Sequence, residues 1–190
     1  MQPLLVLPLL AFLILLTLFA LVVRRAARFI AATRDVERFR RQVGDLADRV
    51  EISLGEICGR IDAMRRGQLG ADQVGDDLNA SLDAVARYSD DALGLHPPSD
   101  GSAIRDEIIA IRDEIIAALA RTARALEMVE HGRAIQASAR AGGREIEAQT
   151  AIKRGYLNVL HAREAIAHQA KMARRLSATD ETTGFQRRNA

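Results

Sequence analysis

The chain has 190 residues, of which 27 % are charged and 4 % aromatic, and its basic and acidic side chains leave a formal net charge of +2 at neutral pH. A single cysteine excludes a disulfide framework and a cysteine-based metal cluster. The abundance of Ala, Ile, Leu, Arg and Glu favours helix over strand.

An uncharged apolar stretch opens the sequence. Residues 3–23 contain no charged side chain, and Arg24, Arg25 and Arg28 follow directly. A helix of this length rises about 32 Å, which matches a hydrocarbon core of about 30 Å. No basic residue precedes the stretch and no A-x-A cleavage site closes it, so a cleaved signal peptide is the weaker interpretation. We expect residues 1–23 to form an uncleaved transmembrane signal-anchor.

The charge around this stretch predicts its orientation. Seven arginines lie between residues 24 and 41, against only two acidic residues. Basic residues beside a span stay in the cytoplasm. We therefore expect a single-pass protein of a bacterial inner membrane, with its N-terminus outside and residues 24–190 cytoplasmic. Arg24, Arg25 and Arg28 lie within reach of anionic lipid headgroups, at about 1 kcal/mol each; a role in setting topology alone is the alternative.

A heptad seam follows the apolar stretch. Apolar residues recur every three or four positions from residue 29 to residue 64, as in a helix that packs along one side. No helix-breaking residue separates residues 23 and 24, so we expect the span to continue directly into this helix. The residues of this seam that we expect to mediate association are Phe29, Val36, Phe39, Val43 and Leu46.

Two breaks bound a second, acidic helix. Residues 67–72 (GQLGAD) predict a turn with Asp72 as the N-cap of a helix over about 73–94, and Pro97-Pro98 ends that helix. Residues 67–102 carry seven acidic side chains and one basic side chain, between two segments with a basic excess. This distribution predicts that the acidic segment packs against the basic ones.

A seven-residue repeat marks the next helix. The sequence IRDEIIA at 104–110 recurs at 111–117, and a period of seven preserves helical phase. We expect the repeat to place Ile104, Ile108, Ile111 and Ile115 on one seam that mediates association. Residues 141–143 predict a break, with one unbroken rod over 102–177 as the alternative.

The last helix carries a charged residue within its apolar stripe and a group of polar residues on its other side. Arg163 falls within its apolar stripe, so we expect it to extend to solvent or to meet an acid, with the acidic second helix as the expected source. His161, Glu164 and His168 share the opposite side at a spacing that metal-binding helices use. Without further inward carboxylates we interpret them as solvated, and metal-dependent catalysis is a minor hypothesis.

The predicted architecture is all-α. One N-terminal transmembrane helix (1–23) continues into a cytoplasmic helical bundle or coiled coil (24–177), and a disordered tail follows (178–190). We find no phosphate loop, catalytic constellation or nucleic-acid motif. We therefore expect no enzymatic activity, cofactor, metal, small-molecule substrate or nucleic-acid partner.

The predicted function is a membrane-anchored scaffold or assembly protein that acts through helix–helix association, as a homo-oligomer or with a helical partner. The alternative is an accessory subunit of a membrane signalling or transport complex.

Overall fold

The structure is a computed structural model that describes residues 6–97, 103–138 and 143–176, without the side chains of residues 6–11, 28, 29 and 32. Every element in these ranges is helical, which confirms the all-α class. The elements are α1 (Val6–Arg65), the 3₁₀ turn η2 (Ala71–Gln73), α2 (Gly75–Leu93), α3 (Ala103–Ser138) and α4 (Glu145–Arg175).

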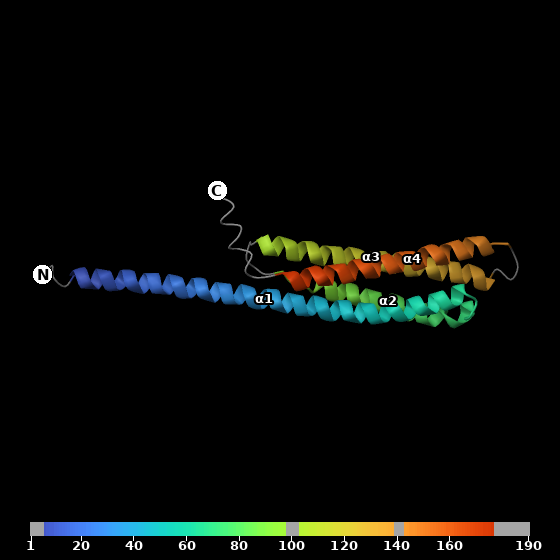
Figure 1. Cartoon of the computed structure of the whole chain (residues 1–190), viewed down its shortest axis with the longest axis horizontal. Coiled ribbons are helices and arrows are strands. Elements are labelled where there is room, and N and C mark those ends of the chain that lie inside the picture. Colours follow the sequence, from blue (N-terminus) through green and yellow to red (C-terminus); the bar gives the residue numbers. More distant parts are fainter. Residues whose placement is uncertain (1–5, 98–102, 139–142, 177–190) are drawn as a thin grey trace.

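The four long helices form an up-and-down bundle from which α1 projects. Successive helices run in opposite directions, and the N-terminal part of α1 extends beyond the other three (Figure 1). Both α1 and α3 pack against α2 and α4, so α2 and α4 occupy opposite corners of the bundle. The predicted continuity across residues 23 and 24 is confirmed, because α1 is one helix through both positions.

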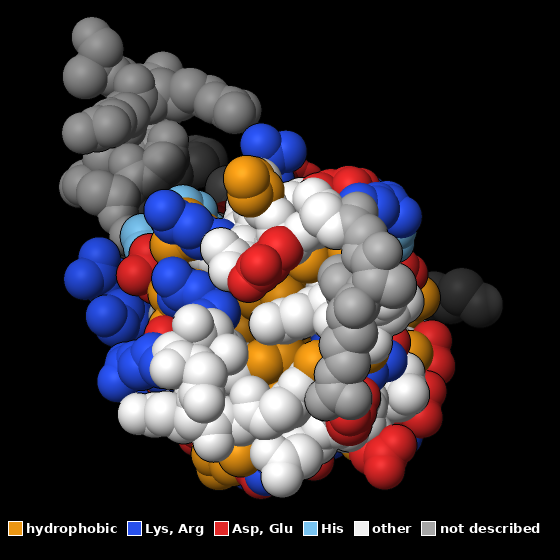
Figure 2. Space-filling model, turned by 90° about the vertical axis from the view of Figure 1, so that its right-hand side faces the viewer, with side chains coloured by type: hydrophobic (Ala, Val, Ile, Leu, Met, Phe, Trp, Pro, Cys, Tyr) orange, Lys and Arg blue, Asp and Glu red, His pale blue; other side chains and the backbone are white. Residues whose placement is uncertain are grey.

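The heptad seam of α1 lines the core. Each predicted seam residue from Val36 to Met64 is buried, and the four isoleucines of the α3 seam belong to the same cluster. Seen from the end of the bundle farthest from the projection, hydrophobic side chains lie between the helices and charged side chains surround them (Figure 2). The two seams that the sequence identifies therefore form the core together with buried apolar residues of α2 and α4.

The turn between α1 and α2 differs in detail from the prediction. Gly67 adopts φ 72°, a left-handed conformation that glycine enters without a Cβ clash. Asp72 is not the N-cap of α2, because it lies inside η2 and α2 begins at Gly75. The Gly70 N–H donates to Oε1 of Gln73 at 2.9 Å, and this bond stabilises η2 ahead of α2. Pro98 lies outside the described residues.

The α3–α4 pair is a hairpin, so the unbroken rod is excluded. The two helices pack along each other through glycines that allow close approach. A Cβ atom on Gly155 would lie 2.6 Å from Cγ2 of Val129, and one on Gly132 would lie 2.8 Å from the carbonyl oxygen of Ala148. Neither position has room for a larger residue unless the helices separate.

Within the described part of the chain, no helix combines the length and the apolar character required to cross a membrane. The span expected from the sequence begins at residue 3, and residues 1–5 lie outside the described ranges, as does the tail at 178–190. The transmembrane segment and the disordered tail therefore stay predictions.

We expect Gly155→Ala to destabilise the fold by about 1–3 kcal/mol, because the added methyl group overpacks the α3–α4 contact. The control is Gly59→Ala, at an exposed position of α1 with open space for a Cβ atom. There the higher helix propensity of alanine stabilises by about 0.5–1 kcal/mol. Thermal unfolding followed by circular dichroism measures both changes. An equal rise in stability for both variants would contradict the close α3–α4 contact.

Candidate functional site

The projecting part of α1 is the most distinctive surface of the protein. Ten large apolar side chains on it each expose 49–69 % of their surface: Phe12, Leu13, Ile14, Leu15, Leu16, Leu18, Phe19, Leu21, Val22 and Val23. The other three helices lie farther along α1 (Figure 1). A contiguous apolar surface of this kind makes the projecting part of α1 the candidate interaction site.

The single clearly polar side chain in this stretch is satisfied within the helix. The Thr17 hydroxyl lies 2.7 Å from the carbonyl oxygen of Leu13 and 2.9 Å from that of Ile14, as a donor to the helix backbone. The described part of the stretch therefore presents apolar groups around its whole circumference. A helix that is apolar all round needs an apolar environment on every side.

Basic residues follow the apolar stretch. Arg24 and Arg25 are exposed on the projecting helix. The side chains of Arg28 and Phe29, which we also predicted to make contacts, lie outside the described residues. The described geometry thus brings together the apolar surface and two of the three predicted headgroup-binding arginines.

The end of α4 is attached to α1 where the bundle begins. Nη2 of Arg40 donates to the carbonyl oxygen of Arg174 at 2.6 Å, and Nη1 of Arg40 lies 3.2 Å from Glu37. A guanidinium at the C-terminal end of a helix donates to a free carbonyl group and interacts favourably with the negative end of the helix dipole. This contact holds the last turn of α4 against α1 at the base of the projection.

A second contact between α1 and α4 joins Arg163 to Glu51. Nε of Arg163 donates to Oε2 of Glu51 at 2.7 Å, and Nη2 donates to Oε1. The hydrogen bond from Arg163 lowers the pKa of Glu51, and the bond to Glu51 raises the pKa of Arg163. The predicted partner from the acidic second helix is therefore wrong. Because α2 lies diagonally across the bundle from α4, the acid comes from α1 instead.

The acidic helix α2 pairs with α1, as its charge predicts. Nη2 of Arg49 lies 2.8 Å from Oδ2 of Asp91, and Nε of Arg60 lies 2.5 Å from Oδ2 of Asp77. The guanidinium of Arg49 also stacks over the ring of Tyr88, 5.6 Å from its centroid. These contacts join α1 to α2 on the side opposite Arg163.

The predicted association residues have partners within one chain. Apart from Phe29, they are all buried in the bundle core: Val36, Phe39, Val43, Leu46, Ile104, Ile108, Ile111 and Ile115. These seams belong to the shared core of the four helices of one molecule, so contact between separate chains needs a different surface. Association between chains stays a prediction, and these buried residues cannot mediate it.

The remaining chemical candidates lack the geometry of a reactive site. His161, Glu164 and His168 are exposed on α4, and no group of residues suited to a metal ion occurs in the described ranges. Cys58 is buried, and its burial raises the pKa of the thiol. A thiol with a raised pKa is a weak nucleophile and suits the packed face of α1.

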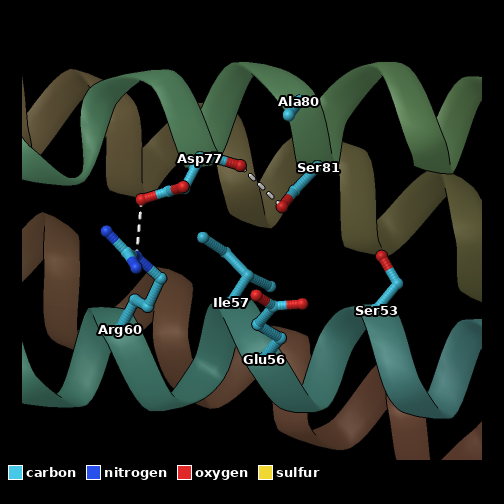
Figure 3. A pocket seen from close by; sticks show the side chains of 7 residues that line it. All are labelled: Ser53, Glu56, Ile57, Arg60, Asp77, Ala80 and Ser81. Atoms are coloured by element: carbon cyan, nitrogen blue, oxygen red, sulfur yellow. Dashed lines mark hydrogen bonds and ion pairs between the residues drawn. The ribbon is translucent and has the colours of Figure 1, made fainter.

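A small groove lies between α1 and α2. It encloses about 170 Å³, with Arg60 and Glu56 from α1 facing Asp77 and Ser81 from α2 (Figure 3). The carboxylate of Asp77 contacts Arg60, and the Ser81 hydroxyl donates to the backbone oxygen of Asp77 at 2.7 Å. The Arg60–Asp77 contact joins α1 to α2, whereas the Ser81 bond lies within α2.

Comparison with protein-family models, with curated proteins and with solved structures finds no match to this chain.

We expect the Arg163–Glu51 pair to contribute stability that depends on pH. Because folding lowers the pKa of Glu51, the contribution is complete above the pKa of an unfolded glutamate, about 4.3, and is lost as the pH falls through the lowered value. A partly exposed pair of this kind contributes about 0.2–1 kcal/mol.

Unfolding of the wild type and of Glu51→Gln at several pH values measures this contribution. The difference between the two proteins should be greatest near neutral pH and shrink below pH ~4.3. Glu127→Gln, on the exposed face of α3, controls for the loss of one surface carboxylate. A constant difference across the pH range would show that the ion pair does not stabilise the fold.

Proposed function

We propose that the chain is a single-span, membrane-anchored helical scaffold or assembly protein. Its apolar N-terminal helix lies in an inner membrane with the N-terminus outside, and the bundle stands on the cytoplasmic side. The observation that carries this proposal is the row of exposed apolar side chains on the projecting part of α1.

The energetics favour a lipid environment for this row. Burying one large apolar side chain is worth about 1.5–3 kcal/mol, so ten of them represent about 15–30 kcal/mol. None of the described helices covers these side chains, and the bundle has its own complete core. A hydrocarbon layer surrounds a helix on all sides, which matches an apolar surface that runs around the whole circumference.

The arginines that follow support the orientation. Arg24 and Arg25 are exposed beyond the last apolar residue, where an anchored helix would leave the hydrocarbon core. There they face anionic headgroups and keep this end of the helix on the cytoplasmic side. Protease treatment of right-side-out and inverted membrane vesicles tests the orientation, because the bundle should be digested in inverted vesicles alone.

A scaffold suits the rest of the molecule better than an enzyme does. The polar side chains that join α1 to α2 and α4 bind one another across helix contacts. They build a rigid body on a helix of 60 residues, which spans about 90 Å. Such a body can hold a partner at a fixed distance from the bilayer.

The continuity of α1 favours a second candidate, an accessory subunit of a membrane signalling or transport complex. One helix joins the projecting segment to the far end of the bundle, so a displacement at one end would be passed to the other. Cross-linking in native membranes followed by mass spectrometry separates the two candidates. A stoichiometric membrane partner supports the accessory subunit, whereas self-association alone supports the scaffold.

We expect the double substitution Leu13→Arg and Leu16→Arg to release the protein from the membrane. Each arginine near the centre of a span costs about 2.5–3.5 kcal/mol of insertion free energy, and each lost leucine removes a further favourable contribution. The measurement is the share of the chain that stays in the membrane fraction after alkaline carbonate extraction.

The matched control is Ile52→Arg, at an apolar side chain of α1 that is 72 % exposed within the bundle. It should stay in the membrane fraction like the wild type. Recovery of the wild type in the soluble fraction would refute the anchor, and so would full retention of the double variant.

A further inference from the structure

The two diagonal helices of the bundle carry opposite charge. Helix α2 contains five aspartates and one arginine, whereas α4 contains six basic and three acidic side chains. The other two long helices separate them, so these charges face away from each other on opposite sides of the molecule. One molecule therefore presents an acidic side and a basic side.

The outward charges on α2 form a line. Asp76, Asp83 and Asp90 are exposed and follow one another at intervals of seven, which places them along one face of the helix. Asp83 and Asp90 have no ion pair with any described residue, unlike Asp77 and Asp91, which pair with α1. The outer face of α2 is therefore acidic, with Arg87 as its one cation. Asp76 also interacts electrostatically with Arg133 of α3, so within the described residues it is Asp83 and Asp90 that lack an ion pair.

The outer face of α4 has the complementary pattern. Arg154, Lys171 and Arg175 are exposed and share one face with His161 and His168, and none of the three cations has an ion pair among the described residues. Leu157, 43 % exposed, lies on the same face. Glu164 is the one acidic side chain in this row.

The contacts of α1 show that the two outer faces lie at the same level, that is, at the same position along the bundle axis. Asp77 and Asp91 of α2 lie beside Arg60 and Arg49 of α1. On the other side, Tyr156 of α4 lies under Arg65 of α1, and Arg163 lies beside Glu51. Both α2 and α4 run back toward the projecting end, so the acidic row and the basic row cover the same stretch of the bundle (Figure 1).

We propose that copies of this chain pack side by side in the bilayer, with the outer face of α2 from one copy against the outer face of α4 from the next. The inference rests on the anchoring proposed above, because insertion in one direction gives every copy the same orientation and level. Side-by-side packing then places Asp90 at the level of Lys171 and Asp76 at the level of Arg154. The contact joins unlike faces, so it forms a row or a closed ring.

Cross-linking of the full chain in membranes tests the contact. Asn79→Cys on the outer face of α2 and Leu157→Cys on that of α4 place thiols at nearly the same level. Two differently tagged single variants, expressed together, should form a mixed cross-linked dimer under mild oxidation. The double variant should form a ladder of higher species. Cross-linking of each single variant with itself, or no cross-link in the mixture, would overturn the proposal.

Two controls make the result specific. The wild type reports the background from Cys58, which is buried. Glu127→Cys, on the exposed face of α3, replaces Asn79→Cys in the second control and should give no mixed dimer with Leu157→Cys. A mixed dimer of equal yield with Glu127→Cys would mean random collision in the membrane and would overturn the specific contact.

Charge reversal tests the chemistry of the contact. In the cysteine background, Asp83→Lys with Asp90→Lys should reduce the ladder at least tenfold, and so should Lys171→Glu with Arg175→Glu. Co-expression of the two reversed proteins should restore cross-linking between them, which a folding defect would not. High salt should weaken the wild-type ladder, because the paired charges are exposed.

Carbonate extraction of the same samples separates this inference from the proposed function. Reversed proteins that stay in the membrane but cross-link like the wild type refute the lateral contact and leave the anchor intact. Wild-type protein that leaves the membrane refutes the anchor, and with it the common orientation on which the lateral contact depends.

Discussion

The burial of the α1 seam is the interaction on which the rest of the structure depends. From Val36 to Met64 this helix turns one face into the core, where α2 and α4 pack against it. Upstream of Val36 the helix continues without a break, but the other helices lie beside its later part. The same element therefore supplies both the centre of the bundle and an apolar surface that the bundle leaves uncovered. The proposed function rests on this division, because the uncovered part needs an environment that the described chain does not provide.

Features that depend on local patterns could be predicted from the sequence. The seams follow from apolar periodicity, and the turn near Gly67 and the break before Glu145 follow from glycines that interrupt helices. The acid that pairs with Arg163 could not be predicted in this way. Sequence charge pointed to α2, but the choice between α1 and α2 depends on which helices are neighbours in the bundle. That order is a property of the packed fold, and it placed Glu51 beside Arg163.

The glycines and the candidate site show the same limit of prediction from the sequence alone. In the sequence, Gly132 only weakens a helical stripe, and nothing distinguishes Gly155 from Gly59. In the fold, Gly155 lies against the backbone of α3, whereas Gly59 faces open space. Likewise, the apolar stretch and its arginines can be recognised in the sequence because these residues follow one another along the chain. The placement of the acidic and basic faces on opposite sides cannot be predicted from the sequence, because it appears only when α2 and α4 take diagonal positions.

That diagonal arrangement also limits how the charges can be neutralised. The inner flank of α2 is compensated by Arg49 and Arg60, and Arg163 of α4 is compensated by Glu51. The outer charges are separated by the width of the bundle, about 20 Å for helices packed at 8–10 Å. This exceeds the screening length of about 8 Å at physiological salt, so the two outer faces cannot compensate each other within one molecule. Small ions or another macromolecule must do so, and a second copy held in the same orientation brings the complementary face at the required level.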